Sequence, residues 1–145
     1  MKTVRHLLQA KGYDIWSIAP EVSVFEALKL MADRNVGAVL VIDARGDLVG
    51  IFSERDYARK VVLKGKTSRD TPVRDIMTEK VVCVRADQSI EECMALMTGK
   101  RIRHLPVLDG GDLVGVISIG DVVKAVISEQ EFMIEQLANY ITGTR

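Results

Sequence analysis

The sequence repeats itself, and this repetition constrains the fold more than any other feature. Residues 15–43 align with residues 81–109 at a constant offset of 66 positions. After a one-residue deletion in a turn, residues 47–62 align with residues 112–127 at an offset of 65. Repetition on this scale indicates two copies of one supersecondary unit. Identical residues at matching positions include Ser23 and Ser89, Met31 and Met97, Asp43 and Asp109, Gly50 and Gly115, Ser53 and Ser118, and Asp56 and Asp121.

Each copy predicts the same order of elements, β-α-β-β-α. The first helix has Ser23 or Ser89 as its expected N-cap, with a glutamate three residues later as in a capping box. Both helices carry apolar residues at i, i+3, i+4 and i+7, which predicts one buried stripe on each. The second helix is expected to start near Ser53 or Ser118. The stripes are Val24, Ala27, Leu28 and Met31, and Ile90, Cys93, Met94 and Met97, and the expected strands are 15–18, 38–42, 48–52, 81–84, 105–108 and 113–117.

The two copies are expected to pack together, because a unit of about 50 residues buries too little surface to be stable alone. The predicted fold class is therefore α/β (α+β): two repeated units related by a pseudo-twofold axis, plus a C-terminal helix. A lead-in also repeats, since residues 4–8 resemble residues 73–77. We expect a first domain with its lead-in at 1–64, a linker and second domain at 65–127, and a separate C-terminal helix at 128–145.

Composition excludes several classes of protein. Twenty Lys and Arg balance twenty Asp and Glu, and zero net charge argues against a general binder of polyanions. The hydrophobic content of 48% and mean hydropathy of +0.12 exclude disorder as the main state. No apolar run reaches the roughly 18–20 residues of a membrane span, and the first residues lead into no signal-peptide core. Two cysteines cannot form a disulfide framework. We expect a cytoplasmic protein with no membrane partner.

The sharpest repeated motif is Gly-x-x-Ser-x-x-Asp, which ends at Asp56 in the first copy and at Asp121 in the second. Its serine stands where a strand ends and a helix begins, so backbone N–H groups and the helix dipole favour a phosphate there. An aspartate in the first turn can accept both hydroxyls of a ribose, as in dinucleotide-binding folds. Ser-x-x-Asp is also typical of a helix-capping pair. Both interpretations stay open.

A second cluster, residues 101–107, places Arg101, Arg103 and a histidine that can carry charge at the mouth of a strand. These side chains are costly to bury unless they are paired. The equivalent stretch of the first copy is uncharged and small. Cys83 and Cys93 lack metal-ligand spacing and are expected in the core. No motif of a hydrolase, metalloprotease or P-loop enzyme is present.

Taken together, these motifs resemble a pair of cystathionine β-synthase (CBS) domains, often called a Bateman module. The resemblance runs from about residue 4 to residue 127. It rests on the doubled unit, the lead-in at 75–78, the stretch 103–109 and the two Gly-x-x-Ser-x-x-Asp turns. The resemblance implies binding of an adenosine compound, namely AMP, ADP, ATP, NAD or S-adenosylmethionine, in two clefts between the paired domains. It implies a homodimer of such pairs and no catalytic cofactor.

The resemblance also implies a role for individual residues. In one cleft the aspartate holds the ribose, the serine, arginine and histidine side chains hold phosphates, and Val82 and Ile102 flank the base. We expect the other cleft to bind phosphate less well, because Gly120 stands where the first copy has Arg55. Trp16 either fills that base pocket or stacks on a larger ligand. The first cleft would use Ser53, Arg55, Asp56, Thr78, Val82, Ile102, Arg103 and His104, and the second would use Ser118, Asp121, Trp16, Val36, Gly37 and Ala38.

These residues favour a stand-alone, non-catalytic energy sensor that signals to an unidentified effector protein by a ligand-dependent shift between conformations. An enzyme acting on a nucleotide or dinucleotide is the alternative from another class, with His104, Asp56 and Asp121 as acid–base candidates. A weak nucleic-acid binder is the third interpretation. It would use the basic face at 55–74, including Lys60, Lys64 and Lys66. Zero net charge makes this third interpretation the least favoured of the three.

Overall fold

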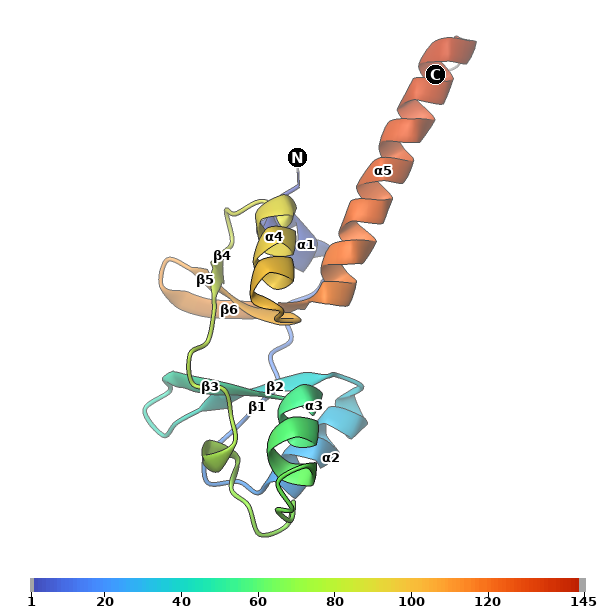
Figure 1. Cartoon of the computed structure of the whole chain (residues 1–145). Coiled ribbons are helices and arrows are strands. Elements are labelled where there is room, and N and C mark those ends of the chain that lie inside the picture. The colour runs from blue at the N-terminus through green and yellow to red at the C-terminus, as the bar shows by residue number, and fades with distance from the viewer. Residues whose placement is uncertain (1, 144–145) are drawn as a thin grey trace. The chain divides into compact units, whose positions relative to one another are not determined.

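The computed structural model describes residues 2–143. They form two compact units, each a three-stranded sheet with helices on one face (Figure 1). The first-repeat unit is Ile15–Val82, and the second-repeat unit contains residues 2–14 and 83–143. The predicted mixed α/β fold with two repeats is confirmed.

The first-repeat unit is built from β1 (Ser17–Ile18), α2 (Val24–Arg34), β2 (Ala38–Ile42), β3 (Leu48–Ser53), α3 (Glu54–Asp56), the π-helix η1 (Tyr57–Val62) and the 3₁₀-helix η2 (Val73–Asp75). Its sheet has the order β1-β2-β3, with β1 parallel to β2 and β2 antiparallel to β3. The core lies where the buried stripe of α2 meets the sheet. Its members include Val24, Ala27, Met31, Val39, Val41 and Phe52.

The second-repeat unit repeats this plan with α1 (Val4–Lys11), β4 (Val84–Arg85), α4 (Ile90–Lys100), β5 (His104–Asp109), β6 (Asp112–Ser118) and α5 (Ile119–Thr142). Its sheet has the order β4-β5-β6, with the same pattern of directions. The first strand of each sheet is shorter than predicted, because only two residues of β1 and of β4 pair with the next strand.

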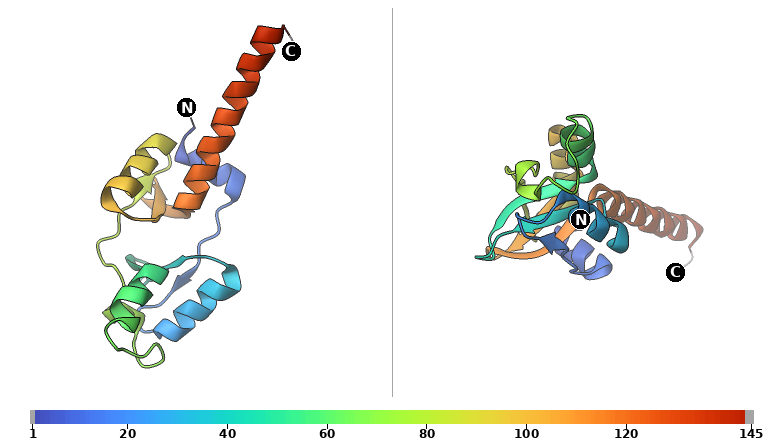
Figure 2. Two further views of the ribbon diagram at one scale, coloured as in Figure 1. Left: turned by 45° about the vertical axis from the view of Figure 1, so that its right-hand side comes forward. Right: turned by 90° about the horizontal axis from the view of Figure 1, so that it is seen from below.

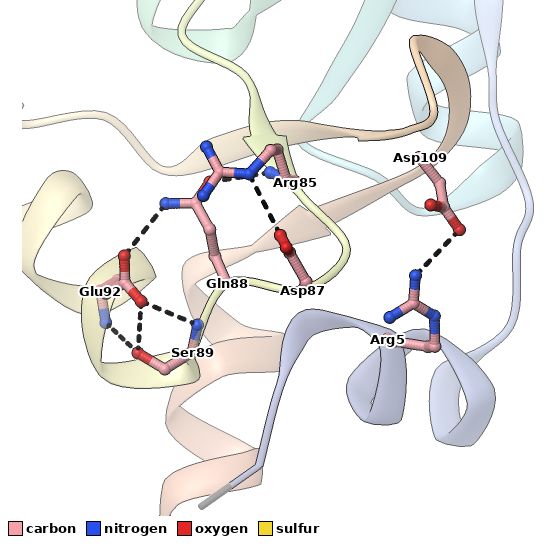
Figure 3. Close-up of polar contacts among 7 residues, drawn as sticks. All are labelled: Arg5, Arg85, Asp87, Gln88, Ser89, Glu92 and Asp109. Carbon is pink, nitrogen blue, oxygen red and sulfur yellow. Dashed lines mark hydrogen bonds and ion pairs between the residues drawn. The ribbon is translucent and has the colours of Figure 1, made fainter.

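The two helices that carry the buried stripes begin at the predicted serines. Ser23 Oγ accepts a hydrogen bond from the backbone N–H of Glu26 (3.2 Å), and Ser89 Oγ accepts one from that of Glu92 (3.1 Å). In α4 the capping box is complete, because Glu92 Oε1 also accepts from the Ser89 N–H (Figure 3). Each such cap stabilises its helix by about 1 kcal/mol.

The first lead-in belongs structurally to the second repeat. The backbone N–H groups of Val4 and Arg5 donate to the carbonyls of Gln88 and Ala86, both at 2.9 Å. The Arg5 guanidinium also reaches Asp109, with Nη2 and Oδ2 3.1 Å apart (Figure 3). Helix α1 therefore completes the second-repeat unit, although it precedes the first repeat in the chain.

The second lead-in is placed in the same way on the first repeat. The Val73 N–H donates to the Val22 carbonyl (2.8 Å), and Met77 lies over Gly50 of β3. In the second-repeat unit Leu8 lies over Gly115 of β6 in the matching position. Each sheet thus has an apolar residue of a lead-in over its glycine. These units differ from the division at residues 64 and 65 expected from chain order, because each lead-in covers the sheet of the other repeat.

The C-terminal segment does not form the separate helix expected at 128–145. Helix α5 runs without a break from Ile119 to Thr142 and ends at Gly143, whose φ of +73° is the left-handed conformation common after a helix. No proline or interior glycine after Gly120 interrupts it. Its C-terminal half extends beyond the sheet and the other helices of its own unit (Figure 2).

Candidate functional site

The first Ser-x-x-Asp motif is closed by its own hydrogen bonds at the start of α3. Ser53 Oγ accepts from the Asp56 N–H (3.2 Å), and Asp56 Oδ2 accepts from the Ser53 N–H (3.0 Å). The other carboxylate oxygen, Oδ1, accepts from Thr78 Oγ1 (3.0 Å) and lies 3.0 Å from Lys60 Nζ. The Asp56 side chain is only 10% exposed. Both oxygens of this carboxylate are therefore bonded within the protein. Oδ2 caps α3, and Oδ1 contacts Thr78 at the end of the second lead-in.

The second motif is more open. Ser118 Oγ accepts from the Asp121 N–H (3.1 Å), and Asp121 Oδ2 accepts from the Ser118 N–H (2.8 Å). Lys11 Nζ lies 2.7 Å from the same Oδ2 and donates to the Val116 carbonyl (2.8 Å). Within residues 2–143, no group donates a hydrogen bond to Asp121 Oδ1, and the side chain is 24% exposed. One oxygen of this carboxylate is available to a hydroxyl group.

Asp121 is held in its ionised form. Burial alone would raise its pKa, but the hydrogen bond from Lys11, the Ser118 N–H and the Lys11 charge together lower the pKa below its usual value. At neutral pH the site therefore pairs a carboxylate with an ammonium group. Such a pair offers an acceptor for a hydroxyl and a cation for a phosphate.

Arg103 and His104 lie beside this second motif. His104 pairs across the strands with Ser118, and the Ile119 N–H donates to the Arg103 carbonyl (2.8 Å). Burial lowers the pKa of His104; Asp121 opposes the shift, and the Lys11 and Arg103 charges add to it. His104 is therefore neutral at pH 7 and offers a ring nitrogen, while the positive charge here comes from Lys11 and Arg103.

The corresponding strand entry in the first-repeat unit is Gly37 and Ala38. Ala38 pairs with Ser53, and the Gly37 carbonyl accepts from the Glu54 N–H (3.1 Å). Each unit thus brings a strand entry next to the motif of its own repeat. The resemblance assigned each entry to a nucleotide held by the motif of the other repeat, and that assignment stays a prediction.

The remaining predicted site residues range from half-buried to exposed. Trp16 is half-buried against the first-repeat core, with the Arg34 guanidinium 4.3 Å from its ring centroid. Val36 also packs against that core. Arg55 is exposed on α3, and Val82 and Ile102 are half-buried.

The sequence did not predict that a lysine contacts each aspartate, Lys60 at Asp56 and Lys11 at Asp121. Lys60 follows Asp56 by four residues, a spacing at which helical side chains meet. Lys11 is 110 residues from Asp121 and reaches it because α1 packs in the second-repeat unit. The alignment of the two lead-ins gave one weak indication that Lys11 belongs to a repeated feature. At the offset that relates residues 4–8 to 73–77, Lys11 corresponds to Lys80.

The cysteines show no sign of reactivity or metal binding. Cys93 is buried, and burial followed by the Glu92 charge raises its pKa to about 11. Burial also raises the pKa of Cys83. Across residues 2–143, no three His, Cys, Asp or Glu side chains are grouped to hold a metal ion. In the same range no helix is long and apolar enough to cross a membrane.

Comparison with known proteins identifies the class to which this fold belongs. The family model described as "CBS domain" matches twice, at residues 5–63 and 73–128. The chain therefore belongs to the CBS domain family. It is a CBS domain pair of the regulatory, signal-transduction type.

Similar proteins carry the same domain pair. A CBS domain-containing protein from Arabidopsis thaliana, CBSX3, named as mitochondrial, is 38% identical over 97% of this chain and 72% of its own length. A solved CBS-domain protein from Burkholderia ambifaria MC40-6, assigned to signal transduction, is 53% identical with a TM-score of 0.86, covering 89% of this chain and 96% of its own. The CBS domain pair of MJ0100, solved with 5′-methylthioadenosine and S-adenosyl-L-methionine, is 23% identical with a TM-score of 0.78, covering 89% and 98%, a likeness of fold alone.

Proposed function

We propose that this protein is a non-catalytic sensor of adenine nucleotides with two unequal sites, one at Asp121 and one at Asp56. The observation that carries the proposal is the open Oδ1 of Asp121 beside the Lys11 ammonium. The bound ligand would be AMP, ADP, ATP or NAD. Binding would shift the population of conformations, and an effector protein would respond to the shift.

At the Asp121 site, the ribose hydroxyls would donate to the free Oδ1. Lys11 would turn from Oδ2 toward a phosphate oxygen, and the Ser118 hydroxyl would add a donor. This supplies the cation that the sequence of the second motif lacks. MJ0100 supports the ligand class at the level of the fold, since it holds two adenosine compounds.

At the Asp56 site, the ribose would have to replace a partner already in place. Four groups occupy the two oxygens of that carboxylate, and a carboxylate offers about four acceptor positions. Thr78 or Lys60 would therefore move away when a nucleotide binds. We therefore expect this site to be the weaker one, despite the exposed Arg55 next to it, which reverses the order expected from the sequence.

Isothermal titration with AMP, ADP, ATP and NAD tests the proposal. We expect the tighter binding event to disappear in Asp121→Ala and to persist in Asp56→Ala. A titration without heat for any of the four nucleotides would refute the sensor proposal. Equal loss of binding in both variants would still agree with nucleotide binding, but it would refute the proposal that the two sites are unequal. Turnover of ATP or NADH that is lost in His104→Ala would favour an enzyme instead.

The proposal includes a homodimer of CBS pairs, an effector protein and a cytoplasmic location. The location is proposed although the Arabidopsis relative is named as mitochondrial. Nucleic acid and membranes are not proposed as partners, because zero net charge gives them little general attraction.

A further inference from the structure

We propose that α5 is a self-association surface, which pairs in antiparallel orientation with α5 of a second copy. The proposal concerns the homodimer suggested above and does not depend on nucleotide binding. It starts from an apolar stripe on α5 whose members are 41% to 86% exposed within residues 2–143. The stripe consists of Val123, Ile127, Met133, Ile134, Leu137, Tyr140 and Ile141.

The stripe has the spacing of one helix face. Each member has another member three, four or seven residues away along a helix of 24 residues. Ile134 is 65% exposed, Leu137 60% and Ile141 81%. The polar residues Glu131, Glu135 and Asn139 lie on other sides of the helix. An amphipathic helix that leaves its apolar side in water favours a partner for that side.

The stripe has the order of size that a stable interface needs. Its exposed fractions leave on the order of several hundred Å² of apolar surface per chain. A stable protein interface buries about 800 Å² on each partner. An open groove of about 500 Å³, lined by α5 residues that include Val123 and Ile127, continues the same surface toward the start of the helix.

Charge selects the antiparallel orientation. The glutamates of the exposed half stand at 129, 131 and 135, whereas residues 136–143 carry no charge. A parallel pair would hold the three glutamates of each copy at the same level as those of the other along the pair, which is repulsive. An antiparallel pair centred near Ile134 places Glu129 and Glu131 at the level of the partner's uncharged residues 136–143. Ile134 then meets the partner's Ile134, and Ile127 meets the partner's Ile141, in a twofold-symmetric contact.

The stripe and the opposite side of the helix allow a matched test. The mass of the full-length chain in solution is measured by light scattering after size-exclusion chromatography. We expect a dimer for the native chain and a monomer for Ile134→Glu and Leu137→Glu. Phe132→Glu is the control, because Phe132 is equally exposed at 62% but lies opposite the stripe; it should remain a dimer. Since these side chains are exposed, circular dichroism should show native helix content in all three variants.

Two results would overturn the proposal. If the native chain is monomeric, the stripe does not mediate self-association and would bind a partner of another kind. If the dimer survives in Ile134→Glu, it forms through another surface. The second result would leave the homodimer standing and refute only the role of α5. Nucleotide titration of Ile134→Glu tests the sensor proposal separately, because that variant should bind nucleotides as the native chain does.

Orientation is tested by disulfide trapping in a Cys83→Ser background, with Cys93 buried in the core. Ile127→Cys chains mixed with Ile141→Cys chains should form a mixed disulfide on mild oxidation, and neither should cross-link well alone. Efficient cross-linking of Leu137→Cys with itself, without the mixed product, would show a parallel pair and refute the orientation.

Discussion

At the scale of single residues, Asp56 and Asp121 have the same sequence context and different surroundings. Both close a capping box with the serine three residues earlier. Thr78 and Lys60 then fill the remaining oxygen of Asp56, whereas Lys11 shares an oxygen that the cap already uses in Asp121. The capping and ligand-binding interpretations therefore do not exclude each other: the cap uses one oxygen, and the neighbours decide whether the other is free.

Lys11→Met tests the assignment of Lys11 to a phosphate. The change keeps the length of the side chain and removes its charge, so AMP binding at the Asp121 site should weaken by about 1.5 kcal/mol, roughly tenfold. Adenosine, which lacks the phosphate, should be affected less. Both affinities are measured by isothermal titration. Lys80→Met, at the matching position of the other lead-in, is the control, and equal losses for AMP and adenosine would contradict the assignment.

His104 should make stability depend on pH. Its pKa is lowered in the folded protein by burial, so the unfolded chain binds the proton more readily. The free energy of unfolding should therefore rise with pH from below the lowered pKa up to the ordinary value of 6.5, and level off above it. Asp121 loses its own contribution only in stronger acid, below its ordinary value of 3.8.

Urea unfolding at several pH values between about pH 5 and about pH 7 measures this dependence. His104→Gln should flatten the curve in that window. His6→Gln, which replaces the only other histidine, is the comparison variant. A slope that survives in His104→Gln would show that another group is responsible.

At the scale of helices and strands, local signals predicted the elements well. Ser23 and Ser89 cap the helices as expected, and β2 has the predicted bounds. These features depend on residues within a few positions of one another. The placement of α1 depends on contacts with residues more than 80 positions away, such as Val4 with Gln88. No local pattern encodes such a contact, so the sequence predicted the lead-ins but not the sheets they cover, and Lys11 was missed with them.

The glycines under the lead-ins give a test of that placement. A methyl group on Gly115 would lie 2.8 Å from Leu8 Cδ2, and one on Gly50 would lie 2.5 Å from Met77 Sδ and 3.1 Å from the Thr78 carbonyl. Both alanine variants should be destabilised by about 1–3 kcal/mol through overpacking. Gly50→Ala should lower the free energy of unfolding more than Gly115→Ala does. The Thr78 carbonyl is held by a hydrogen bond from the Ile51 N–H and can move aside less easily than the end of the Leu8 side chain.

Urea unfolding of Gly115→Ala alone and together with Leu8→Ala measures the coupling between the two positions. The free energy of unfolding should fall less in the double variant than the sum of its decreases in the two single variants, because Leu8→Ala makes room for the new methyl group. Strictly additive losses would mean that Leu8 does not lie over Gly115.

At the scale of the whole molecule, the compact units do not follow chain order. The first-repeat unit is one continuous stretch, Ile15–Val82, whereas the second-repeat unit is made from both ends of the chain. Removal of the N-terminal residues should therefore weaken the unit that contains the C-terminus.

Hydrogen exchange of a chain lacking residues 1–11 tests this expectation. Amides of β4 and α4 should lose protection, because Val4 and Arg5 no longer bond to Gln88 and Ala86. Amides of β2 and β3 should exchange as in the intact chain. Faster exchange confined to β2 and β3 would contradict the division into units.

The discontinuous unit also has a consequence for how the chain folds during synthesis. The first-repeat unit can fold as soon as Val82 has left the ribosome, because the contacts within it join residues of one continuous stretch. Helix α1 is made before that unit, yet its partners at Ala86 and Gln88 are made only after the unit is complete. Its apolar side, with Val4, Leu7 and Leu8, therefore stays exposed to solvent until then. Helix α1 thus precedes the first-repeat unit in synthesis and follows it in folding.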